Sequence, residues 1–280
     1  MSMRRRLAIL LVIPLLLMAL LAMTVLLVPD RELQGIVVRS LGRAGYTFQA
    51  AGFGKALPLG VTARNISIGD ERGTLVTADE AWFRLRFWPL LTGRVLLAYR
   101  ARIGKGVVEG EFSPWIDPKG RLLVDGVRLE DIPFFLTVTD AKVKGALGVE
   151  GSWRGAGNAR RGELRLEVKG ADLAGIKISG TPLPDAGYDT VQGALKIEGE
   201  KAILQSFTLQ GSGLYVRLKG DFPMTSPLAN APLNLTLELM PKPEFLDRQK
   251  FVFLLLSKYL ASPGYYQIPI RGMLKKPSIQ

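Results

Sequence analysis

The sequence predicts a mainly β protein: one N-terminal transmembrane helix, then a long antiparallel sheet that curls on itself, with a short membrane-proximal helix and one late helix. Short runs that alternate apolar and polar residues recur along the chain, and glycine-containing turns separate them. Glycine is abundant, at 31 of 280 residues, while aromatic residues make up only 8%. This composition is typical of many strands joined by turns.

The first 28 residues predict a cytoplasmic tip and a transmembrane anchor. Leu7 to Val28 are 22 consecutive uncharged positions; as a helix they would extend about 33 Å, enough for a bilayer core of about 30 Å. Arg4 to Arg6 precede the run, so the N-terminus is predicted to be cytoplasmic and residues 29–280 to form one β-rich domain on the other side. The alternative is a signal peptide cleaved near Ala22, whose apolar region would normally span about 7 to 15 residues.

The later elements follow in order as a short helix, a series of strands and a late helix. Asp30 to Ala44 carries apolar residues at helical spacing, and Gly45 ends it. Residues 243–260 predict a helix with an apolar centre, which either plugs one end of the sheet or contacts a membrane or partner. Residues 129–135 predict a short helix or turn. Alternation predicts strands over residues 46–53, 61–68, 77–87, 94–103, 105–112, 122–127, 140–153, 162–170, 190–198, 202–210, 213–222, 232–240 and 265–274.

Composition also limits the function. The chain has neither cysteine nor histidine, which excludes disulfides, thiolate or imidazole metal ligands and histidine-dependent catalysis. No phosphate-binding loop and no convergent acidic pair is present in the sequence. The net charge of +12 is dispersed along the predicted strands, which favours a solvated face over a surface for lipid headgroups or a partner. We expect a protein that is not an enzyme, has no cofactor or metal, and binds no nucleic acid.

The apolar face of the predicted sheet is the candidate binding site. An apolar strand face usually forms a closed core. The few predicted helices leave a second interpretation open, in which part of this face is an exposed groove for acyl chains. The residues of this candidate lipid-facing groove are Phe83, Leu85, Phe87, Leu164, Leu166, Val168, Leu195, Ile197, Leu235 and Leu237.

Four segments together resemble a known family. Residues 65–68 (NISI), 75–81 (LVTADEA) and 85–93 (LRFWPLLTG) resemble the N-terminal region of AsmA-like proteins, and residues 268–279 (IPIRGMLKKPSI) are similar to the end of those domains. With its length and single predicted anchor, the whole chain is most similar to the type II secretion system protein N (GspN) family.

The resemblance implies a single-pass inner-membrane protein with a periplasmic domain, associated with the machine that exports folded proteins across the outer membrane. The function expected from it is a non-enzymatic accessory component of type II secretion that contacts other subunits through its periplasmic domain. AsmA-like relatives are linked to lipid handling, so the alternative is a phospholipid-handling protein with an apolar groove. The resemblance assigns no functional residue.

Overall fold

A computed structural model of the chain describes residue 23 and residues 27–57, 59–115, 118–178, 180–225 and 228–279. The predicted transmembrane helix, residues 7–28, therefore lies almost entirely outside the described residues. Within those residues, no helix is both long and apolar enough to cross a membrane.

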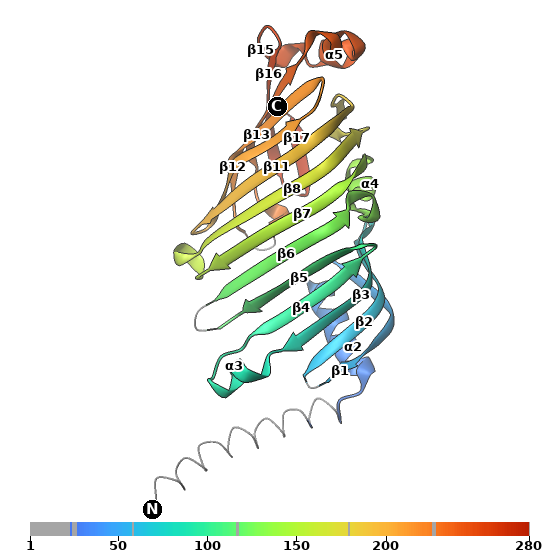
Figure 1. Cartoon of the computed structure of the whole chain (residues 1–280), viewed down its shortest axis with the longest axis vertical. Coiled ribbons are helices and arrows are strands. Elements are labelled where there is room, and N and C mark those ends of the chain that lie inside the picture. Colours follow the sequence, from blue (N-terminus) through green and yellow to red (C-terminus); the bar gives the residue numbers. More distant parts are fainter. Residues whose placement is uncertain are drawn as a thin grey trace, which may run out of the picture.

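The described part of the protein is mainly β, with one large antiparallel sheet of 15 strands and few helices (Figure 1). Each predicted strand has a counterpart in this sheet, and most consecutive strands are neighbours. The strands are β1 (Thr47–Ala56), β2 (Gly60–Asp70), β3 (Gly73–Leu85), β4 (Leu97–Ile103), β5 (Gly106–Ser113), β6 (Lys119–Arg128), β7 (Lys142–Arg154), β8 (Arg161–Ala174), β11 (Ala186–Glu198), β12 (Lys201–Gln210), β13 (Leu214–Pro223), β14 (Asn234–Pro241), β15 (Leu260–Ser262), β16 (Tyr265–Met273) and β17 (Lys276–Ile279).

The sheet is open. Among the described strands, β1 pairs only with β2, and β15 and β17 pair only with β16. The prediction that the sheet curls on itself is therefore wrong: among the described strands the sheet is open, and no pairing joins its two ends. Two very short strands, β9 (Lys177–Ile178) and β10 (Thr181–Pro182), form a separate pair within the long connection from β8 to β11.

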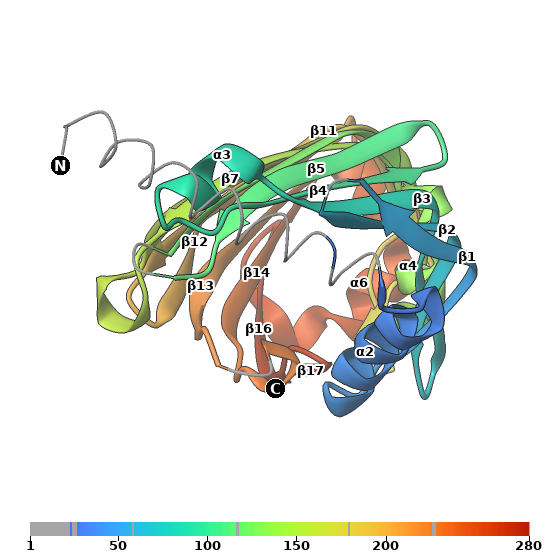
Figure 2. The same cartoon turned by 90° about the horizontal axis from the view of Figure 1, so that it is seen from below.

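Five short α-helices accompany the sheet in the described residues: α2 (Asp30–Arg43), α3 (Phe87–Leu91), α4 (Phe134–Thr139), α5 (Pro243–Arg248) and α6 (Lys250–Leu255). The predicted helix from Asp30 is confirmed as α2, which lies beside β1 (Figure 2). The α5 helix lies at the opposite end of the sheet's long axis (Figure 1).

The two faces of the sheet differ in chemistry because side chains alternate along each strand. On the apolar face, Leu237 is the register partner of Leu218 and Ile268. The charged face carries cross-strand ion pairs, such as Arg100 Nε with Glu109 Oε2 at 3.6 Å. Most of these pairs are exposed and each contributes at most about 1 kcal/mol; the buried pair of Lys219 and Glu238 is the exception. The apolar face therefore supplies most of the stability of the sheet.

The main hydrophobic core lies where α5 and α6 cover the apolar face of β13, β14 and β16. Leu239, Leu256 and Ile268 are almost completely buried there. The ring of Phe253 lies 6.2 Å from that of Phe245 and 5.1 Å from that of Tyr266. The late segment thus covers one part of the sheet, as the plug interpretation predicts.

The predicted late helix over residues 243–260 is wrong as a single helix. It is divided into α5, α6 and a 3-10 turn at Ser257–Tyr259, and Gln249 lies between the two α-helices with φ −110° and ψ 25°. The break directs both Phe245 and Phe253 into the core. Packing of these two rings thus accompanies a break that the apolar pattern does not reveal.

Other differences from the sequence prediction occur at strand ends. The predicted strand 77–87 ends at Leu85, and Phe87 begins α3, where Pro89 has no backbone N–H for a sheet ladder. Residues 129–135 form a 3-10 turn at Leu129–Asp131 followed by α4. The strand β17 was not predicted, because its lysine and proline resemble a chain tail.

Candidate functional site

The predicted groove residues divide into a covered part and an open part. Val168, Leu235 and Leu237 are buried in the main core, with exposed fractions below 10%. Phe83, by contrast, is 46% exposed. The others on the strands are half-buried, namely Leu85, Leu164, Leu166, Leu195 and Ile197. The structure therefore closes one part of the apolar face and leaves another part accessible.

Phe87 does not belong to this face. It lies in α3, half-buried, and its ring meets that of Trp88 edge to face at 5.7 Å. The prediction that Phe87 points the same way as Phe83 and Leu85 is therefore wrong, because the strand ends before it.

Five apolar side chains form one row across the accessible part. Strand register places Phe83 opposite Tyr99, and Leu164 opposite Leu195. Leu122 lies between these two pairs. Gly110 is the register partner of both Tyr99 and Leu122, and Gly151 is the register partner of both Leu122 and Leu164. We call Phe83, Tyr99, Leu122, Leu164 and Leu195 the open apolar row. It crosses from β3 to β11, a distance of about 29 Å at about 4.8 Å per strand.

Glycines beside the row allow large side chains to lie along the sheet. A Cβ on Gly110 would lie 2.5 Å from the Tyr99 hydroxyl oxygen, and a Cβ on Gly120 would overlap the Trp153 ring. Phe83 stacks on Tyr99 with ring centroids 5.7 Å apart. Burial raises the pKa of the Tyr99 phenol, so its hydroxyl stays neutral. These residues form an apolar floor whose rings lie against glycine backbone.

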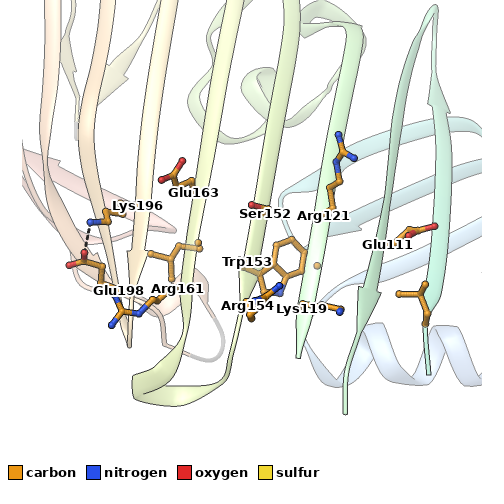
Figure 3. A pocket seen from close by; sticks show the side chains of 14 residues that line it. Glu111, Lys119, Arg121, Ser152, Trp153, Arg154, Arg161, Glu163, Lys196 and Glu198 are labelled. Atoms are coloured by element: carbon orange, nitrogen blue, oxygen red, sulfur yellow. Dashed lines mark ion pairs between the residues drawn. The ribbon is translucent and has the colours of Figure 1, made fainter. Parts of the chain in front are cut away.

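A pocket of about 630 Å³ lies near the strand ends of β6, β7, β8 and β11, lined chiefly by charged side chains (Figure 3). Lys119, Arg121, Arg154, Arg161 and Lys196 contribute positive charge. The negative groups are Glu111, Glu163 and Glu198. Gly120, Trp153, Gly162 and Ile197 also line the pocket, and strand register places them on the same face as Leu85. The pocket therefore lies at the strand ends between charged and apolar side chains.

The acidic groups of this pocket have basic neighbours. Lys196 Nζ lies 2.6 Å from Glu198 Oε1, and this hydrogen bond, together with the charges of Lys196 and Arg161, lowers the pKa of Glu198. Glu111 accepts a hydrogen bond from Arg86 at 2.7 Å. Arg121, which lines the pocket, pairs with Glu150, and Glu163 pairs with Arg165 beside the pocket. The arrangement is a network of solvent-exposed ion pairs.

The most buried charged residue of the described chain is Glu238, which is 2% exposed. Burial opposes its ionisation, but hydrogen bonds from Lys219 and the Tyr265 hydroxyl and the charges of Lys219 and Arg217 lower the pKa of Glu238 overall. Lys219 Nζ lies 2.5 Å from Glu238 Oε1. Glu238 is thus a buried carboxylate with a structural role, whose charge is balanced by its neighbours.

The described residues contain neither an unsatisfied buried polar side chain nor an acidic cluster suited to a metal ion. No buried side-chain nitrogen or oxygen there lacks a hydrogen-bond partner. No group of three or more acidic residues there is arranged to hold a metal ion.

A second apolar surface lies on α6. Phe251, Leu254 and Leu255 are 72%, 67% and 46% exposed, and their spacing of three and four residues places them on one side of the helix. We call these three residues the α6 patch. Phe253, on the other side of the helix, is 2% exposed. The sequence prediction offered a plug or a contact with a membrane or partner as alternatives. One side of α6 lies in the core, as the plug interpretation predicts, and the other side is exposed.

Sequence reasoning missed the exposed tryptophans in the connections between strands. Trp88 is 77% exposed in α3, and Trp115 is 64% exposed after β5. Their place beside proline in predicted turns was the available signal.

Comparison with models of protein families, with curated proteins and with solved structures finds no match to this chain. No known protein therefore informs the interpretation of the surfaces described above.

Proposed function

We propose that this protein is a non-enzymatic accessory component of the type II secretion system, anchored in the inner membrane by its N-terminal segment and contacting other subunits through its periplasmic domain. The resemblance of residues 65–93 and 268–279 to the AsmA-like and GspN pattern supports this assignment. The observation that carries the contact role is the α6 patch, because large apolar side chains exposed together mark interaction sites.

The α6 patch is well placed for such a contact. It belongs to a helix whose other side is fixed in the core by Phe253 and Leu256, so the patch is presented on a rigid support. Arg248 and Lys250 flank it in sequence, which suits a partner surface that is apolar at its centre and acidic at its rim.

Co-purification of the full-length chain with the other inner-membrane secretion subunits tests this role. Leu254→Ser is expected to reduce recovery of those subunits at least tenfold, since a central apolar contact contributes about 1.4 kcal/mol or more. Leu136→Ser is the matched control, because Leu136 is also exposed, at 60%, but lies on α4. Equal recovery with both variants would contradict a contact through α6.

The open apolar row favours a second function, the handling of phospholipid. Its span of about 29 Å exceeds the half-thickness of a bilayer core, about 15 Å, over which one acyl chain extends. An acyl chain laid along the row would cover Phe83 and its half-buried neighbours. We propose this function as the alternative to the secretion role.

Retention of phospholipid after detergent exchange tests the alternative. We expect co-purifying phospholipid to be lost in Leu85→Asp while the far-ultraviolet circular dichroism is retained, because Leu85 is half-buried on the accessible part of the face. Leu237→Asp should instead unfold the protein, since it places a charge in the closed core. A lipid-free wild-type chain would refute the lipid function and leave the subunit-contact function in place.

A further inference from the structure

The connections after β1, β3, β5 and β7 lie along one edge of the sheet. In an antiparallel sheet with sequential order, every second connection occurs at the same end of the strands. The backbone of Leu85, at the end of β3, donates a hydrogen bond to Leu59 in the first connection. The connections after β3 and β7 lie along the same side of the molecule (Figure 1). We call these four connections the loop edge.

Large apolar side chains project from the loop edge. Leu57 in the first connection is 67% exposed, Trp88 in the second 77% and Trp115 in the third 64%. Scattered exposed leucines are ordinary on a soluble surface. Two strongly exposed tryptophans at neighbouring connections of one edge are unusual on such a surface. Tryptophan is enriched where a protein meets the membrane–water interface, so this pair points to a membrane contact.

The loop edge is also basic. Among the described residues, six basic residues and no acidic residue lie in these connections or directly beside them: Arg86, Arg94, Lys119, Arg154, Arg160 and Arg161. Asp117, in the same stretch of sequence, lies outside the described residues. The connections after β2, β4 and β6, at the other end of the strands, carry four basic and five acidic residues counted in the same way. Among the described residues, Arg94, Arg154 and Arg160 form no ion pair. The positive charge is therefore available to an external anionic surface.

The chain enters the sheet domain at this same edge. Asp30, the first residue of α2, lies 3.8 Å from Lys55, which is close to the end of β1 and to Leu57. The uncharged run from Leu7 to Val28 ends directly before α2 in the sequence. A membrane that holds residues 7–28 would therefore be connected to the domain at the loop edge and not at the opposite end of the strands.

We propose that the loop edge docks on the surface of an anionic phospholipid bilayer, with Leu57, Trp88 and Trp115 at the interface and the basic side chains on the headgroups. Each basic side chain near an anionic membrane strengthens binding about fivefold, and the exposed apolar side chains add to this. Docking holds the domain against the membrane beyond what the tether alone does. It also brings the ends of the strands that carry the open apolar row toward lipid.

Site-directed fluorescence on the full-length chain tests the docking, because the native chain contains no cysteine. Asn158→Cys places a label in the connection after β7, and Lys105→Cys places one in the turn after β4. The labelled chains are reconstituted in nanodiscs of phosphatidylcholine with or without phosphatidylglycerol. Headgroup-attached and acyl-chain spin labels then report quenching of each fluorophore.

We expect strong quenching at position 158 and little at position 105 in the anionic nanodiscs. Arg154→Gln with Arg160→Gln should weaken the docking equilibrium about 30-fold, through the loss of two charges. Lys142→Gln with Lys144→Gln, at the other end of β7, is the matched control and should leave quenching unchanged. Equal quenching at positions 158 and 105, none at either, or no dependence on phosphatidylglycerol and on the two arginines would overturn the proposal.

Discussion

Replacing Phe83 and Leu237 by alanine measures how far the apolar face is open. Both residues lie on the same face of one sheet, but Phe83 is 46% exposed and Leu237 is 7% exposed. A fully buried Phe→Ala change costs about 3 to 5 kcal/mol and a buried Leu→Ala change about 2 to 5 kcal/mol. Because nearly half of the Phe83 surface already meets solvent, its truncation loses about half of the transfer free energy and leaves no enclosed cavity.

We therefore expect Phe83→Ala to lower the free energy of unfolding by about 1.5 kcal/mol and Leu237→Ala by about 3 kcal/mol or more. Urea denaturation of the full-length chain in detergent, followed by circular dichroism, gives both values from the shift in midpoint at constant slope. A larger loss for Phe83→Ala than for Leu237→Ala would refute the assignment of an open part to the apolar face.

Cysteine accessibility provides an independent reading of the same prediction. The chain has no native cysteine, so Phe83→Cys and Leu237→Cys each introduce a single reactive position. We expect a water-soluble thiol reagent to modify Cys at position 83 in the native state. At position 237 we expect the reagent to react only after the protein has unfolded. Rapid modification at both positions would contradict a closed core under α5 and α6.

Three further predictions concern packing and charge. Gly120→Ala should cost about 1 to 3 kcal/mol of unfolding free energy in urea, because its Cβ overlaps the Trp153 ring. Lys219→Met should cost about 3 kcal/mol by the same measurement, since it removes a partner from the buried Glu238 carboxylate. Because the pKa of Glu238 is lowered in the folded state, its ionised form stabilises the fold above the unfolded pKa, and this stabilisation is lost as the pH falls below about 4. Glu238→Gln should therefore make the urea midpoint depend less on pH between pH 6 and pH 3.

Each of these has a matched control or an opposing outcome. Gly187→Ala should be close to neutral, because a Cβ there meets no atom within 4 Å in the structure. A Gly120→Ala variant as stable as Gly187→Ala would show that Trp153 does not lie on the glycine. Exposed Lys169, whose partner Glu167 is also exposed, should tolerate Lys169→Met. A Glu238→Gln variant with the wild-type acid sensitivity would show that other carboxylates dominate.

The sheet was predictable because many of its strands alternate apolar and polar residues. Glu163 to Lys169 has apolar and charged residues in perfect alternation, and it falls inside β8 with Val168 in the core. The same local rule failed at Phe87, where alternation continued past the true end of β3. Proline at position 89 was the correct signal for that end.

The open and closed parts of the apolar face were not predictable from local pattern. Leu164 and Leu237 occupy equivalent alternating positions, yet only Leu237 is covered. The difference arises because Phe245 and Phe253 are brought over β14 and β16 by a segment whose break at Gln249 has no glycine or proline to mark it. Coverage is a tertiary property, while alternation reports only which side of a strand a residue occupies.

Photocrosslinking from residue 254 in cells that contain the complete secretion machine tests the central claim most directly. A photoreactive amino acid replaces Leu254 in the full-length chain, and the crosslinked products are identified by mass spectrometry. The proposed function predicts crosslinks to other inner-membrane type II secretion subunits from position 254, and none from position 136 on α4. A subunit contact through the α6 patch would be contradicted if position 254 gave no crosslinks to those subunits. It would also be contradicted if position 136 gave them equally often.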